Sequence, residues 1–118
     1  MLVIGGADRT DGNYYATTEI YDPRTASFES GPSMAYRRYN IAGTSVLLPD
    51  GNVLVTSGAR AAELLDIASW TFHEVPDRLP DAYRFAAAAP LRGGKVLITG
   101  GYSVRNQNTA GVWRFREQ

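Results

Sequence analysis

Apolar residues along this chain gather in short runs that end at glycine. Three such runs, LVIGG at 2–6, LVTSG at 54–58 and LITGG at 97–101, repeat one pattern. Each run has the length and the β-branched content of a strand, and the glycine marks its end. The spacings between the three are close to the roughly 40–50 residues of many structural repeats. The pattern therefore predicts an array of repeated units built from strands.

The residues that flank these runs recur in the same order. The matching blocks are TTEIYDPRTASFES (17–30) with AAELLDIASWTFHE (61–74), and TSVLLPDGNVLVTSG (44–58) with AAPLRGGKVLITGG (88–101). The first match superposes Glu19 on Glu63 and Asp22 on Asp66. The third copy, TAGVWRFREQ (109–118), keeps apolar positions but loses both acids. Because the two glutamates recur in equivalent places, we expect a repeated structural role for them rather than acid/base chemistry.

The connections between the apolar runs are typical of hairpin turns. Pro49-Asp50-Gly51, Arg92-Gly93-Gly94 and Pro23 to Ala26 each lie between two runs, and glycine and proline favour tight turns there. The alanine-rich stretch AYRFAAAAPL has helix propensity, but its equivalence to IAGTSVLL favours a strand. Each repeat thus reads as four antiparallel strands, the blade of a β-propeller. We expect large aromatic residues, Phe28 among them, to pack between neighbouring blades.

The chain resembles the kelch-repeat β-propeller family in its bacterial, galactose-oxidase-like variety. Gly5-Gly6, then EIYDP at 19–23, then Phe28 form the kelch pattern, and LLPDGNVLVTSG at 47–58 is similar to the bacterial kind. Ser57 departs from it by replacing the first glycine of the second pair. The resemblance implies an all-β fold. It leaves function open, because kelch propellers include both enzymes and binding modules.

The repeat predicts a partial propeller of about three blades, with three, four and three antiparallel strands. The blades span about 1–32, 39–76 and 83–118. The resemblance implies six or seven blades in a closed ring, so this chain alone does not close one, and apolar blade faces remain uncovered. Either the chain is part of a longer propeller, or copies associate. We favour a homodimer that completes a six-bladed ring, because two-fold assemblies are common.

Composition narrows the classes of partner. Twelve Lys and Arg balance twelve Asp and Glu, whereas a nucleic-acid-binding protein usually has a basic excess, so we expect no nucleic acid. No apolar run has the length of a membrane span, and no signal peptide is visible, so we expect no membrane. These features leave the compartment open and favour the cytoplasm slightly.

The sequence offers few candidates for catalytic or metal-binding residues. There is no cysteine and one histidine, His73, so a galactose-oxidase-like copper site, which needs two histidines and a crosslinked cysteine, does not fit. The repeat places His73 on an outer strand, away from a catalytic triad. GGKVLITGG at 93–101 does not match a phosphate-binding loop. We therefore expect no enzymatic activity, no cofactor and no metal.

Long loops gather on one face of the expected propeller, and binding sites usually lie on such loops. Seven arginines and five tyrosines belong to this face: Arg9, Arg37, Arg38, Arg60, Arg78, Arg84, Arg105, Tyr14, Tyr15, Tyr36, Tyr39 and Tyr83. Arginine forks with tyrosine rings suit carboxylates and phosphates. Alternatively, nearby aspartates, including Asp8 and Asp81, neutralise the arginines as ordinary loop charge.

We predict a binding module for a protein or peptide partner, an acidic peptide or another anionic ligand, because acidic peptides dock on such faces in kelch adaptors of ubiquitin ligases. The residues expected to bind it are Arg37, Arg38, Tyr39, Tyr83 and Arg84. The alternative is a non-catalytic fragment of a secreted carbohydrate-active or oxidase-like kelch enzyme.

Overall fold

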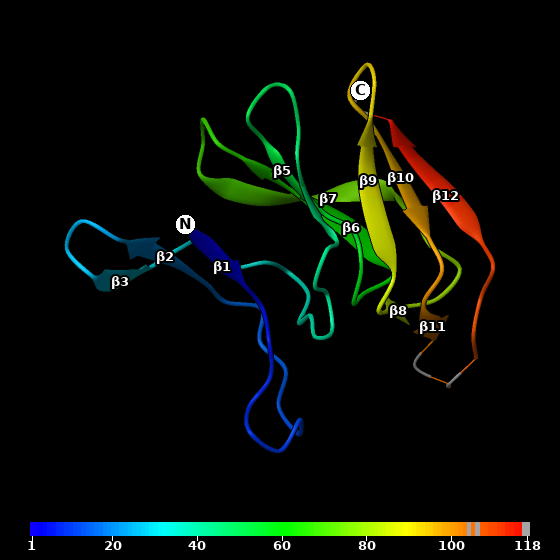
Figure 1. The fold of residues 1–118 in the computed structure, drawn as a ribbon, viewed down its shortest axis with the longest axis horizontal. Helices are drawn as coiled ribbons and strands as arrows, with labels where there is room; N and C mark the ends of the chain where they lie inside the picture. The colour runs from blue at the N-terminus through cyan, green and yellow to red at the C-terminus, as the bar shows by residue number, and fades with distance from the viewer. Residues whose placement is uncertain (104, 106, 117–118) are drawn as a thin grey trace.

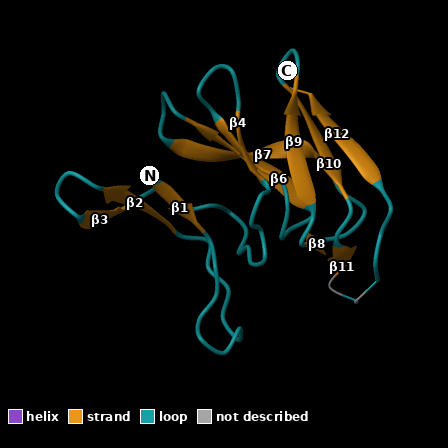
Figure 2. Ribbon diagram, in the orientation of Figure 1, coloured by secondary structure: helices purple, strands orange, loops and turns teal. Residues whose placement is uncertain are grey.

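In the computed structural model, which describes residues 1–103, 105 and 107–116, the chain forms strands and no helix within these residues (Figure 1, Figure 2). The strands are β1 Leu2–Ile4, β2 Thr18–Asp22, β3 Ser27–Ser30, β4 Ser45–Leu47, β5 Val53–Val55, β6 Ala61–Asp66, β7 Thr71–Arg78, β8 Tyr83–Arg84, β9 Ala87–Leu91, β10 Lys95–Thr99, β11 Tyr102–Ser103 and β12 Val112–Arg116. The alanine-rich stretch contains two strands, β8 and β9, where the repeat predicted one.

The strands form several small antiparallel sheets. Their orders are β1-β2-β3, β4-β5-β6-β7 and β9-β10-β12, with a separate pair, β8 and β11. The three larger sheets have the three, four and three strands that the sequence predicted, and they are consistent with partial blades. The β8–β11 pair was not expected. The blade boundaries at 1–32, 39–76 and 83–118 stay predictions, and so does the propeller assembly.

Strand register shows which residues are equivalent in the three sheets. Glu19 lies opposite Val3 in the first sheet, and Glu63 lies opposite Val55 in the second. Val3 and Val55 occupy the same place in the repeated runs, so the two glutamates are true counterparts. In the third sheet the corresponding position, opposite Ile98, is Trp113. The third copy therefore has an aromatic side chain where the second has an acid.

The recurring aspartates stabilise the turns between the third and fourth strands of the repeat. The Asp22 carboxylate accepts a hydrogen bond from the Arg24 amide at 2.9 Å, and the Asp66 carboxylate accepts one from the Ala68 amide at 2.8 Å. Such side-chain acceptors replace backbone partners in a tight turn. Trp70, in the second turn, has φ 57°, which is uncommon for a large side chain. The repeated acid is therefore a local turn signal.

Ser57 departs from the glycine pattern because its backbone differs from that of its counterparts. Gly5 and Gly100 have φ of 62° and 70°, in the left-handed region that favours glycine. Ser57 does not adopt a positive φ, whereas the following Gly58 does. A Cβ on Gly58 would approach the Ile41 Cγ2 to 2.7 Å, so close packing also requires that glycine. The second glycine is thus structural, and the first is replaceable where the backbone does not adopt a positive φ.

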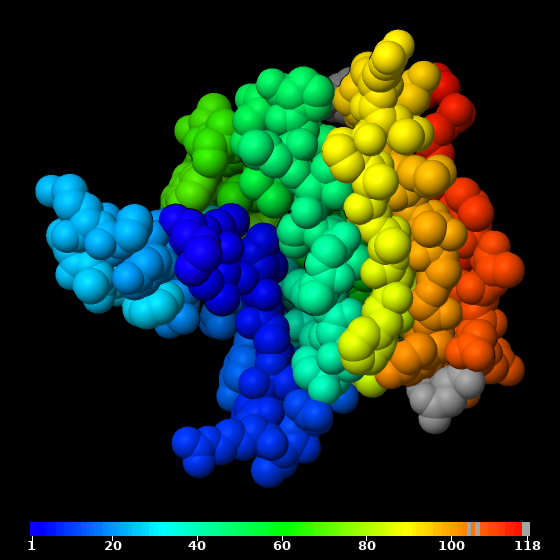
Figure 3. All heavy atoms as spheres, viewed as in Figure 1, coloured from blue at the N-terminus to red at the C-terminus, as the bar shows by residue number. Residues whose placement is uncertain are grey.

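The hydrophobic core lies between the second and third sheets. Its buried members are Val46, Leu48, Leu54, Ala62, Val96 and Ile98. All but Leu48, which directly follows β4, lie in β4, β5, β6 or β10, and Val96 and Ile98 on β10 show the two-residue period of a strand. These two sheets lie side by side in Figure 1, whereas β1, β2 and β3 stand apart and project from the molecule (Figure 3).

The first sheet is joined to the rest mainly by backbone hydrogen bonds. The Gly6 amide donates to the Arg38 carbonyl at 2.9 Å, and the Arg38 amide donates to the Tyr15 carbonyl at 3.1 Å. No residue of β1, β2 or β3 belongs to the core cluster. Phe28, which we expected to pack between blades, is 58% exposed. The first sheet therefore presents apolar surface that this chain by itself does not cover.

Candidate functional site

The five predicted binding residues fall into two groups. Arg37, Tyr39 and Arg84 lie at the surface beside Tyr14. Arg38 and Tyr83 are buried. Residues of the first group can contact a ligand, whereas those of the second group are enclosed in the protein.

Arg38 is a correction to the sequence-based expectation. Its side chain is 0% exposed, and each of its three guanidinium nitrogens donates to an acceptor inside the protein. Nη1 donates to the Ser57 carbonyl at 2.8 Å, and Nη2 donates to the Ala61 carbonyl at 2.6 Å and to Glu63 Oε2 at 2.8 Å. Burial lowers the pKa of Arg38, and the Glu63 carboxylate opposes that shift. The guanidinium therefore supports the fold and is not offered to a ligand.

Glu63 shows why the acid at this position is structural. Besides the Arg38 side chain, its carboxylate accepts the Ala35 amide at 2.6 Å and the Tyr36 amide at 3.3 Å. The incoming loop is thereby tied to β6. A buried carboxylate needs these partners, because leaving such a charge unpaired is strongly destabilising. This agrees with the structural role expected for Glu63, while its counterpart Glu19 is exposed.

Tyr83, in β8, is the counterpart of Arg38 in the third copy of the repeat. The Gly58 amide donates to the Tyr83 carbonyl at 2.8 Å, just as the Gly6 amide donates to the Arg38 carbonyl. The Tyr83 ring stacks on Trp113 with centroids 4.9 Å apart, and Trp113 occupies the position of Glu63. At these two equivalent positions, the second copy of the repeat therefore has an ion pair and the third copy has an aromatic pair. Tyr83, at 8% exposure, is consequently not available to a ligand either.

Tyr14, Tyr39 and Arg84 form a compact group at the surface. The two tyrosine rings are stacked, with centroids 4.9 Å apart and planes 10° apart. The Arg84 guanidinium carbon lies 5.1 Å from the Tyr14 ring and 5.7 Å from the Tyr39 ring. Its Nη2 also donates to the Tyr14 hydroxyl at 3.3 Å. Cation–π attraction and this hydrogen bond fix the arginine over the rings.

Tyr14 is held in place by a loop that Asp8 organises. The Asp8 carboxylate accepts the Thr10 and Gly12 amides, each at 3.0 Å, and the Asn13 Nδ2 at 2.5 Å. These hydrogen bonds, led by those from the Asn13 and Thr10 side chains, hold the pKa of Asp8 far below its usual range. The loop returns through a bridge between Ala7 and Tyr14. A local acid therefore places a tyrosine that the sequence prediction left out of the site.

Arg37 joins the same area through Tyr14. It is exposed, and together with Asn13, Tyr14 and Tyr15 it lines a shallow groove of about 410 Å³. We call Arg37, Tyr39, Arg84 and Tyr14 the Arg/Tyr cluster. Its members come from the loop before β2, the loop before β4, and β8. In the sequence, the only indication that Tyr14 belongs to a binding site was that it is one of the tyrosines in the long loops.

Charge in the Arg/Tyr cluster is not cancelled by ion pairs. Elsewhere Arg78 pairs with Glu74 at 2.5 Å, and Arg105 pairs with Asp81 at 3.4 Å. Among the described residues, Arg37 and Arg84 form no ion pair. A hydrogen bond with the Asp11 side chain raises the pKa of Tyr39. Arg78 and Arg105 are therefore neutralised by neighbouring acids, as in the alternative that treats the loop arginines as ordinary paired charge. Arg37 and Arg84 are not neutralised in this way among the described residues.

Among the described residues, no group of three or more His, Asp or Glu side chains could hold a metal ion. His73 lies exposed on β7, with Nε2 3.0 Å from the Thr71 hydroxyl. Within the same residues, no helix has the length and apolar character to cross a membrane.

Comparison with known families matches residues 1–35 to the Kelch motif. This stretch contains β1, β2, β3 and the loop that carries Tyr14, so the kelch resemblance is confirmed for this part of the chain. No curated protein matches the chain. The motif and the repeated β-sheets together indicate a kelch-repeat module.

Proposed function

We propose that the chain is a non-catalytic kelch-type binding module that recognises an acidic peptide through the Arg/Tyr cluster. The observation that supports this most directly is the Arg84 guanidinium, which lies over two stacked tyrosine rings and has no carboxylate partner among the described residues. A guanidinium is suited to carboxylates because its fork of N–H donors can make two parallel hydrogen bonds.

The tyrosine pair prepares Arg84 for binding. A free arginine side chain loses considerable rotamer entropy when it binds a ligand, and stacking removes part of that loss beforehand. The same rings offer apolar surface to the aliphatic part of a peptide. Arg37, across the shared Tyr14, supplies a second unpaired cation for a second acidic residue. No chemical step is needed for such recognition.

Fluorescence anisotropy with a labelled glutamate-rich peptide tests this function. The peptide with glutamine at each of those positions is the control ligand. Charge-assisted hydrogen bonds contribute about 1.5–3 kcal/mol, so Arg84→Ala should weaken binding about 10- to 100-fold. Arg92→Ala, an exposed arginine in the β9–β10 turn, is the matched control and should bind like the wild type. Equal affinity for the two peptides would contradict the proposal.

A glycan is the alternative ligand class, and one observation favours it. Tyr15 is 42% exposed and lines the same groove as Arg37, and exposed aromatic rings suit the apolar faces of sugars. Screening the protein on a glycan array separates the two ideas. Sugar binding that Tyr15→Ala abolishes, without binding of the acidic peptide, would favour a non-catalytic part of a carbohydrate-active kelch enzyme.

A further inference from the structure

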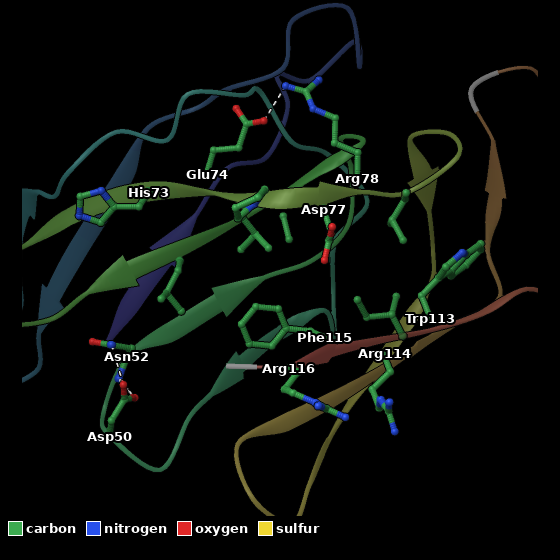
Figure 4. Close-up of a pocket in the computed structure, with 16 residues that line it drawn as sticks. Asp50, Asn52, His73, Glu74, Asp77, Arg78, Trp113, Arg114, Phe115 and Arg116 are labelled. Atoms are coloured by element: carbon green, nitrogen blue, oxygen red, sulfur yellow. Dashed lines mark hydrogen bonds and ion pairs between the residues drawn. The ribbon is translucent and has the colours of Figure 1, made fainter. Parts of the chain in front are cut away.

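A groove of about 690 Å³ runs between β7 and β12 (Figure 4). Apolar side chains from both sheets line it, among them Leu64, Val75, Trp113 and Phe115. It also contains charged groups of β7, and its Arg78 and Glu74 are paired with each other. The groove is open at the edge of β12, which is the outermost strand of its sheet.

In the second sheet, the edge equivalent to the outer edge of β12 is covered by another strand. There β6, the counterpart of β12, is followed by a fourth strand, β7, that pairs with it over most of its length. β12 pairs with β10 on one side, and no described strand pairs with its other side. Its outer backbone N–H and C=O groups are therefore available for another strand.

The side chains of β12 indicate which kinds of side chain a strand needs in order to pair with the outer edge of β12. Trp113 and Phe115 are half-buried and alternate along β12 with Arg114 and Arg116, which are exposed; all four residues line the groove (Figure 4). Neither arginine forms an ion pair within the described residues. Because successive side chains of a strand alternate between faces, a fitting strand carries an apolar residue on one face and an acid on the other.

The β3 strand of this chain has that pattern. All four of its residues are exposed, and it is an edge strand that pairs only with β2. Phe28, with 58% of its surface exposed, and Glu29 are adjacent and therefore lie on opposite faces. Glu29 forms no ion pair among the described residues. The basic edge of β12 and the acidic edge of β3 are thus complementary in charge and in apolar surface.

We infer that β3 of a second copy of this chain pairs with β12, with its Phe28 in the β7–β12 groove and its Glu29 beside Arg114 and Arg116. Cross-strand pairs of opposite charge and of aromatic residues both stabilise a sheet. The contact supplies a fourth strand to the β9–β10–β12 sheet. It gives the self-association expected from the sequence a definite surface, and it does not require a closed six-bladed ring.

Sedimentation velocity over a range of concentrations tests the contact. The wild type should associate as its concentration rises. Arg114→Glu with Arg116→Glu should sediment as a monomer, because like charges then face Glu29. Arg9→Glu with Arg92→Glu makes the same change in net charge at exposed sites outside β3 and β12, and it should associate like the wild type. A monomeric wild type at every concentration, or equal behaviour of the two double variants, would overturn the inference.

Charge exchange makes the test specific to the two strands. Glu29→Arg alone should also prevent association, and adding it to the Arg114→Glu, Arg116→Glu variant should restore it, since both partners are then reversed. Hydrogen–deuterium exchange should show concentration-dependent protection of residues 112–116. If the chain stays monomeric and an acidic, apolar peptide protects these amides instead, the edge belongs to another partner and the second copy is the wrong occupant.

Discussion

At the scale of single residues, Arg38 in the loop before β4 and Arg84 in β8 show that the neighbouring side chains decide what an arginine does. Arg38 meets a glutamate at the facing position and is buried in an ion pair. In β8, Tyr83 takes the inward position and meets Trp113. Arg84, the next residue, is left at the surface over two tyrosine rings. The structural arginine thus faces a carboxylate, whereas the candidate binding arginine, one position further along the repeat, lies over aromatic rings.

Arg38→Met should destabilise the fold strongly, because it leaves the Glu63 carboxylate buried without its cation. Breaking a buried pair in this way costs about 3–5 kcal/mol. Glu63→Leu combined with Arg38→Met should cost clearly less, since no buried charge is then unpaired. Urea denaturation of the two variants measures both effects. If the double variant is no more stable than Arg38→Met, the ion pair does not account for the loss.

At the scale of elements, acids stabilise loops and turns through backbone donors. The amides of Ala68 and Ser69 lower the pKa of Asp66, and the Asn13 and Thr10 side chains lower that of Asp8 more. The Tyr36 hydroxyl, followed by Arg78, lowers the pKa of Glu74. Each of these groups binds protons less readily in the folded chain than in the unfolded one. The loop that carries Tyr14 is thus coupled to pH through Asp8.

Stability should therefore fall in acid. A carboxylate with a lowered folded pKa stabilises the fold above its unfolded pKa, here 3.8 for Asp8, and this contribution is lost as the pH falls toward the folded pKa. Asp8→Asn should melt below the wild type at about pH 7, and the difference should shrink at about pH 3. Differential scanning fluorimetry at both pH values measures this. A difference that stays constant would show that Asp8 acts by shape and not by charge.

At the scale of the whole molecule, the three sheets are not equally supported. The second and third share the core of Leu54, Val96 and their neighbours. The first contributes nothing to that cluster and is joined by backbone hydrogen bonds near Gly6 and Arg38. The residues that match the Kelch motif are therefore the least covered part of this chain. Local unfolding free energies vary in this way with packing.

Amides of β2 and β3 should exchange with deuterium faster than those of β5, β6 and β10 at low protein concentration. The core strands open only when the main core opens, whereas the first sheet can open alone. Hydrogen–deuterium exchange with mass spectrometry measures the order. Equal protection of all three sheets in a monomeric sample would contradict this account.

The sequence by itself determined the strands, their turns and their grouping into sheets of three, four and three strands. Those features depend on local signals, namely alternating apolar residues, glycines that end strands and aspartates that hold turns. Only the tertiary structure decided which of the described arginines form ion pairs and which do not. Arg37, Arg38 and Arg84 look alike in a loop pattern, and what separates them is the residue that each meets across space. Packing sets that partner, because a buried charge must be paired and an exposed one need not be.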